Sequence, residues 1–131
     1  NVLSRVFSPR SKIQGTRSYM SPEQIRGEPL DQRSDIYSFA CTLFEVIGGR
    51  PPFTGATTNE LFSKHLKSSP PPLESLNHDV HPDFAQLVRW GLAKDPAKRP
   101  PTSEEYCQKI ARTTIFRRLP QFVRRPPEPT E

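Results

Sequence analysis

The sequence predicts an all-α fold built around one buried central helix, and three observations support this. Apolar residues recur at helical spacing in several stretches, whereas no stretch sustains the apolar–polar alternation of a half-buried strand. Three stretches carry the capping-box pattern of a helix start, a Ser or Thr followed three positions later by Gln or Glu, namely Ser21 with Gln24, Thr57 with Glu60 and Thr102 with Glu105. One stretch, residues 34–49, is apolar nearly all the way round a helix, so other segments have to cover it.

The central helix has clear signals at both ends. We expect Ser34 to be its N-cap, with Asp35 in the first turn, where the helix dipole favours negative charge. Gly48 and Gly49 provide a left-handed stop, and the prolines that follow prevent continuation. The acidic Asp35 should have a partner outside the helix.

The remaining helices are shorter, and each is predicted from a start signal. Ser21 with Gln24 opens a short helix that ends at Gly27. Thr57 with Glu60 opens a helix to about Lys67, and Pro82 with Asp83 opens one to about Ala93. Thr102 with Glu105 opens the last helix, whose apolar side carries Tyr106, Ile110 and Ile115. Residues 68–72 are proline-rich and should be extended.

The composition limits the size of the hydrophobic core and the classes of binding partner. Only 33% of the 131 residues are hydrophobic and sixteen are proline, so part of the chain should be loop. The net charge of +5 gathers towards the C-terminus and could attract nucleic acid, but no RNA motif or zinc-finger spacing accompanies it. We interpret that end as a solvated, flexible basic tail. No specific nucleic-acid partner is expected.

Cysteine and histidine usage argues against disulfide and metal chemistry. Cys41 and Cys107 fall inside helical patterns without a CxxC neighbour, and we expect both to be free core thiols in a reducing compartment. His78 and His81 lack a third ligand at suitable spacing, so no metal site is predicted. No signal peptide or membrane segment is present, and we expect a cytoplasmic location.

Four ordered stretches point to a family. They are GTRSYMSPEQ at 15–24, DIYS at 35–38, GGRPPFTG at 48–55 and WGLAKDPAKRP at 90–100. Together they resemble the C-terminal lobe of a eukaryotic-like (Hanks-type) serine/threonine protein kinase, from the activation segment to the last helix, with S-P-E in place of A-P-E. The MSPEQ motif is similar to that of bacterial members of the family.

The resemblance implies three parts of the chain. Residues 1–14 would be a partial activation loop, residues 15–112 the helical subdomain of the C-terminal lobe, and residues 113–131 the basic, proline-rich tail. The fold expected is therefore an incomplete kinase lobe around the central helix.

The resemblance also implies roles for single residues. Glu23 and Arg99 should form a buried ion pair that fastens the activation segment, and Asp35 should hold the catalytic loop. Thr16 should position a catalytic Asp and Lys that are missing from this chain. The stretch Gly15, Thr16, Arg17, Ser18 and Tyr19 should line the site for the substrate residue after the phosphorylated one. Ser8 and Ser11, in a basic loop, are candidate activating phosphosites.

Two residues depart from the family pattern. Arg17 stands where a small residue or proline is common, which bears on substrate preference. Ala40 stands where glycine is usual in the central helix, and we expect slightly looser packing there.

The resemblance implies ATP and Mg²⁺ as cofactors and a protein as substrate for a complete kinase. The Gly-rich loop, the strand Lys, H-R-D and D-F-G are absent from these 131 residues. We therefore expect this chain alone to bind neither cofactor, to be inactive, and to need an N-terminal lobe and a catalytic loop as partners. Without them, part of the central helix should be exposed.

Two alternatives stay open beside the kinase interpretation. The first is a non-catalytic helical module that docks partners on helices 58–67 and 82–93. The second, supported by charge only, is a basic helical nucleic-acid binder.

Overall fold

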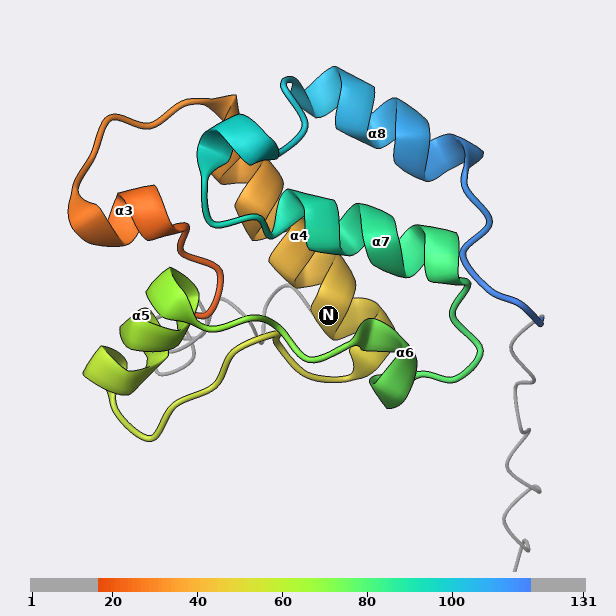
Figure 1. The fold of residues 1–131 in the computed structure, drawn as a ribbon, viewed down its shortest axis with the longest axis horizontal. Coiled ribbons are helices and arrows are strands. Elements are labelled where there is room, and N and C mark those ends of the chain that lie inside the picture. The colour runs from red at the N-terminus through yellow and green to blue at the C-terminus, as the bar shows by residue number, and fades with distance from the viewer. Residues whose placement is uncertain (1–16, 119–131) are drawn as a thin grey trace, which may run out of the picture.

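The fold of the described part of the chain, residues 17–118 of a computed structural model, is helical (Figure 1). Its elements are α3 (Pro22–Arg26), α4 (Gln32–Gly48), α5 (Thr58–Lys67), α6 (Leu73–Leu76), α7 (Pro82–Gly91), a 3-10 turn (Pro96–Lys98) and α8 (Ser103–Arg112). Within these residues the only β pairing is an isolated bridge between Val80 and Phe116. The all-α prediction is confirmed.

Helix α4 begins earlier than the sequence predicts. Its N-cap is Asp31, whose carboxylate accepts a hydrogen bond from the Arg33 backbone N–H at 2.8 Å. The expected N-cap, Ser34, instead lies within the first turn, and its hydroxyl donates to Glu23 at 2.8 Å. The prediction was wrong because a tertiary contact uses the Ser34 hydroxyl. The helix ends where expected, since Gly49 adopts a left-handed φ of 84°.

Burial of α4 is one-sided. Its buried positions are Ser34, Ile36, Tyr37, Ala40, Cys41 and Phe44, and they pack against α6, α7 and α8. On another face, Phe39 is 41% exposed and Val46 is 73% exposed. Part of the central helix is therefore left exposed within residues 17–118, as expected for a lobe without its catalytic loop.

Helices α4 and α7 cross with their backbones in close approach (Figure 1). A Cβ atom added to Gly91 would lie 2.7 Å from the Ala40 Cβ and 2.6 Å from the Tyr106 hydroxyl. Ala40 is fully buried, so its methyl group fills the space that Gly91 leaves open. The looser packing predicted at Ala40 was wrong, because a glycine on the partner helix compensates for the extra carbon.

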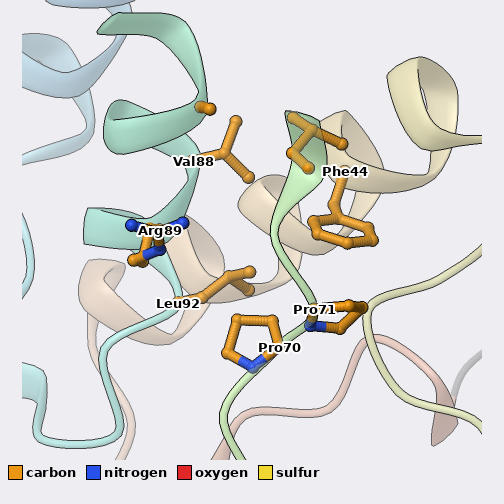
Figure 2. Close-up of a pocket in the computed structure, with 8 residues that line it drawn as sticks. Phe44, Pro70, Pro71, Val88, Arg89 and Leu92 are labelled. Carbon is orange, nitrogen blue, oxygen red and sulfur yellow. The ribbon is translucent and has the colours of Figure 1, made fainter. Parts of the chain in front are cut away.

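Residues 68–72 are extended, as predicted, but they lead into α6, which the sequence signals did not reveal. Pro70 and Pro71 lie beside Phe44 of α4 and Leu92 after α7 (Figure 2). The pocket between them measures about 10 Å³, roughly the space of one water molecule. The prolines therefore close the core at this end of α7.

The helix caps partly follow the predicted capping boxes. The box of Ser21 and Gln24 is complete, with both reciprocal hydrogen bonds. Thr57 and Thr102 each cap their helix, but the Glu60 carboxylate accepts from the Ala56 N–H, one residue before the expected donor. Helix α7 ends at Gly91, two residues earlier than predicted, and its N-cap is the His81 ring.

Two predictions need correction at the C-terminal end. Residues of the expected tail pack on the body, since the Ile115 carbonyl accepts from the His81 N–H at 2.7 Å and the Asp79 carbonyl from the Arg117 N–H at 2.6 Å. Both cysteines are free, but only Cys41 is buried, whereas Cys107 is exposed because it lies on the outer side of α8.

No helix formed by residues 17–118 is long and apolar enough to span a bilayer.

Candidate functional site

The Glu23–Arg99 ion pair predicted from the sequence is present. Arg99 Nη1 and Nη2 lie 2.6 and 2.9 Å from the two carboxylate oxygens of Glu23, and the two side chains are 0% and 5% exposed. The remaining donors reach the backbone carbonyls of Ala93, Lys94 and Arg33 at 2.7, 3.2 and 2.9 Å. All five N–H groups of the guanidinium are therefore used, which makes a buried charge tolerable.

The carboxylate of Glu23 is equally well satisfied. Burial alone would raise its pKa, but hydrogen bonds from Arg99, from its own backbone and from Ser34, together with the charge of Arg99, lower the pKa to about 2. Glu23 is therefore ionised at neutral pH. The pair joins α3, the start of α4 and the turn after α7 at one point.

The segment just before α3 is tied to two helices. Ser38 Oγ of α4 donates to the Tyr19 carbonyl at 2.6 Å, and the Tyr19 hydroxyl donates to the Glu45 carboxylate. Burial and the neighbouring Glu45 raise the pKa of Tyr19. Arg17 Nη1 donates to the Thr58 hydroxyl of α5 at 2.7 Å. The residues at 17–19 are thus held by α4 on one side and α5 on the other.

A buried histidine lies under this segment. His65 of α5 is fully buried; its Nδ1 lies 2.8 Å from the Tyr37 hydroxyl, and the edge of its ring meets Phe53. Burial, aided by the nearby Lys94 charge, lowers the pKa of His65 to about 4, although the backbones of Arg17 and Ser18 oppose the shift. His65 is therefore neutral at physiological pH.

Lys94 is a half-buried base in the same region. Its Nζ donates to the Lys64 carbonyl at 3.2 Å and lies 4.1 Å from the centre of the Phe53 ring. Burial lowers the pKa of Lys94 to about 8, with a further contribution from Arg99, although Cys41 opposes the shift. The ammonium is still mostly protonated at neutral pH, and it faces the same interior as His65.

The other predicted site residues are distributed differently. Asp35 is exposed in the first turn of α4, and its role in holding a catalytic loop stays a prediction. Gly15, Thr16, Ser8 and Ser11 lie outside the described residues. Sequence reasoning missed Ser34, Ser38, Glu45, His65 and Lys94. Of these, only His65 carried a local signal, because it lies one helical turn after the buried Leu61.

The described residues do not fit a metal–nucleotide site. Residues 17–118 contain no group of three or more His, Cys, Asp or Glu side chains placed to hold a metal ion. The carboxylate at the centre of the site, Glu23, is committed to Arg99 and Ser34. We therefore assign none of residues 17–118 to ATP or Mg²⁺. What the arrangement does provide is a rigid support for residues 17–19.

Comparison with known proteins gives a consistent result. The family described as protein kinase domain matches residues 3–110. A probable serine/threonine-protein kinase of Corynebacterium efficiens is 36% identical over 122 residues, which cover 88% of this chain and 18% of the relative. The serine/threonine-protein kinase PknB of Mycolicibacterium smegmatis is 42% identical over 91 residues, covering 70% of this chain and 15% of the relative. The chain thus spans less than a fifth of these relatives.

Two solved structures agree in fold. The twitchin kinase region from C. elegans superposes with a TM-score of 0.69 at 20% identity, covering 78% of this chain and 18% of that one. The Rad53 kinase domain superposes with a TM-score of 0.60 at 23% identity, covering 70% and 36%. With its ion pair, its central helix and these matches together, the chain belongs to the protein kinase family and has the fold of the helical C-terminal lobe.

Proposed function

We propose that this chain is the substrate-binding part of a serine/threonine protein kinase, which, when complete, transfers the γ-phosphate of ATP to Ser and Thr hydroxyls of protein substrates. The family membership and the names of the bacterial relatives support the reaction class. In this proposal the cofactors ATP and Mg²⁺ bind to parts of the kinase other than residues 17–118.

One observation supports the substrate-binding role above all others. Residues 17–19, expected to line the site next to the phosphorylated residue, are immobilised by the Glu23–Arg99 pair behind them and by hydrogen bonds to α4 and α5. The rate of reaction between two bound groups depends on such positioning, because a fixed geometry removes the entropy cost of orienting them. The site thus has the rigidity that a peptide-binding surface needs.

The 131-residue chain alone should be inactive. The motifs for phosphate binding, the catalytic base and magnesium are absent from the sequence, and Asp35 is exposed in the first turn of α4. We assign to Asp35 the role of holding the catalytic loop of the complete kinase. Thr16 is assigned the role of positioning the catalytic Asp and Lys, which this sequence does not contain. The free thiol of buried Cys41 suits a cytoplasmic, reducing location.

The test compares two proteins. The full-length protein that carries this chain, incubated with radiolabelled ATP, Mg²⁺ and a mixture of Ser- and Thr-containing peptides, should label the peptides, whereas residues 1–131 alone should not. Arg99→Ala in the full-length protein should abolish labelling. Labelling only of Tyr peptides, or none by the full-length protein under autophosphorylating conditions, would overturn the proposal.

Ser8 and Ser11 are assigned as activating phosphosites in the same proposal. Their sequence context is basic, with Arg10 between them and Lys12 after them, so a phosphate would find cationic partners close by. Mass spectrometry of the active full-length protein should find phosphate on at least one of the two. The double variant Ser8→Ala with Ser11→Ala should lower its activity.

A groove favours the alternative of a non-catalytic interaction module. It is lined by Gln86, Leu87, Arg89 and Trp90 of α7 and by Lys109 of α8. Its lining is mainly apolar, and Lys109 Nζ lies 4.7 Å from the centre of the Trp90 ring. This function would be favoured if the full-length protein proved inactive towards all peptides but retained a binding partner lost on Trp90→Ala.

A further inference from the structure

Two half-buried cations without a carboxylate partner contact α5, the helix that also holds the proposed substrate segment. In the described range, four cationic side chains are half-buried, namely Arg17, Arg33, Lys64 and Lys94. Arg33 pairs with Asp31, and Lys64 pairs with Glu60. Arg17 and Lys94 have no ion pair among residues 17–118. Both side chains bond to α5, Arg17 at the Thr58 hydroxyl and Lys94 at the Lys64 carbonyl.

Arg17 has donors to spare. A guanidinium carries five N–H donors, and within residues 17–118 its side chain makes one hydrogen bond, to Thr58 at 2.7 Å. The neighbouring sequence cannot supply a carboxylate, because residues 1–16 contain Arg5, Arg10 and Lys12 but no Asp or Glu. A half-buried charge without an ionic partner is costly unless a ligand compensates it. The side chain is thus available to an external anion.

The guanidinium is also held in place in advance. Thr58 is the first residue of α5, and it fixes the end of the Arg17 side chain. His65, two turns further along the same helix, lies under the backbone of residues 17 and 18. The next residue, Tyr19, is bonded to Ser38 and Glu45 of α4. A group immobilised before binding loses little conformational entropy when the ligand arrives, which increases affinity.

We propose that the protein prefers substrates with an acidic side chain directly after the phosphorylated hydroxyl, and that Arg17 is the residue that recognises it. The inference rests on the proposed kinase function. A carboxylate suits a guanidinium, because two parallel N–H donors meet its two oxygens. The positive charge of Lys94 and of residues 1–16 adds a long-range attraction for acidic peptides.

The experiment uses the full-length protein and two peptides that differ only in the residue after the acceptor Ser, Glu in one and Gln in the other. For the natural protein, kcat/KM should be about tenfold higher with the Glu peptide, the usual effect of one charge-assisted contact. In Arg17→Gln the ratio should fall to about one, whereas Arg17→Lys should retain part of it. Thr58→Val, which removes the anchor, should give an intermediate ratio.

A matched control keeps the test specific. Arg50→Gln removes one positive charge from an exposed loop after α4 and should leave both the ratio and the rates unchanged. Raising the salt concentration should reduce the preference of the natural protein, because the contact is only half-buried.

Each of the other outcomes overturns either the proposed function together with this inference, or this inference alone. No phosphate transfer to any Ser or Thr peptide would overturn the proposed function and this inference together. Transfer with equal kcat/KM for both peptides, or a preference that survives in Arg17→Gln, would overturn the inference alone. A third result would also overturn the inference alone: phosphate is found on Ser8 or Ser11, and Arg17→Gln loses activity equally on both peptides. Arg17 would then bind the protein's own phosphate and not the substrate.

Discussion

Arg99 and Glu23, which are 76 positions apart in the sequence, meet through two hydrogen bonds of 2.6 and 2.9 Å in the interior. The contact closes a loop that contains α3, α4, α5, α6 and α7, so it ties the start of the described chain to the turn before α8. Because every guanidinium donor is used, the pair cannot be lost without leaving several buried polar groups unpaired.

Arg99→Ala should therefore lower the free energy of unfolding by about 3–5 kcal/mol, as when one partner of a buried pair is removed. The matched control is Arg89→Ala, whose partner Glu74 lies 4.0 Å away in an exposed pair and whose loss should cost less than about 1 kcal/mol. Urea denaturation of both variants measures the difference. Similar losses in the two would show that the buried pair does not stabilise the fold.

Because Glu23 is ionised in the folded protein, the free energy of unfolding should depend on pH in the acidic range. Its pKa is about 2 in the folded state, below the ordinary value of 4.5, so the unfolded chain binds more protons between these two values. The contribution of Glu23 is fully present above pH 4.5 and is lost as pH falls towards 2. Urea midpoints should fall over this range. In Glu23→Gln, which starts less stable, the fall should be smaller, and an identical fall would assign it to other carboxylates.

His65 should make the free energy of unfolding depend on pH in a second, higher range. Its pKa is about 4 when folded and 6.5 ordinarily, so the unfolded chain again binds more protons in between. Stability should be complete above pH 6.5 and decrease as pH falls towards 4, because a charged ring would be buried beside Lys94. His65→Asn, which cannot titrate, should remove this slope. A slope that persists unchanged in His65→Asn would come from another titrating group, and absence of the slope in the natural protein would mean that His65 is exposed to solvent.

The crossing of α4 and α7 can be tested with a double-mutant cycle. Gly91→Ala places a carbon 2.7 Å from the Ala40 Cβ and should destabilise the fold by about 1–3 kcal/mol. Ala40→Gly should cost about 1 kcal/mol, because glycine is unfavourable within a helix. Combining them should cost less than the sum, since the second change removes one of the clashes created by the first. Strict additivity would mean that the Tyr106 hydroxyl, the other close neighbour, causes the whole loss.

Two valines allow the same substitution to be compared at a buried and at an exposed position. Val88 of α7 is 1% exposed and Val46 of α4 is 73% exposed. Val88→Ala should lower the free energy of unfolding by about 2 kcal/mol, and Val46→Ala should change it by less than about 0.5 kcal/mol. Thermal or urea unfolding of the two variants gives the comparison. A large loss for Val46→Ala would mean that this face is covered in solution, for example by association of the chain with itself.

The sequence by itself determined the helices whose signals are local. The capping box at Ser21, the glycine stop at Gly49 and the spacing of Phe84 and Val88 each lie within a few residues, so they can be read without knowing the fold. The Glu23–Arg99 pair was also predictable, although only through the family resemblance. Nothing in the spacing of two residues so distant implies contact.

Only the tertiary structure decided how α4 starts and what lies beside residues 17–19. Ser34 has the chemistry of an N-cap, but its hydroxyl bonds Glu23, so Asp31 caps the helix. Ala40 fits because Gly91 faces it on another helix, and His65 becomes neutral because Tyr37, Phe53 and Lys94 enclose it. These outcomes depend on atoms that are distant in sequence and adjacent in space. Burial and hydrogen bonding are set by those neighbours, and only the packed fold brings them together.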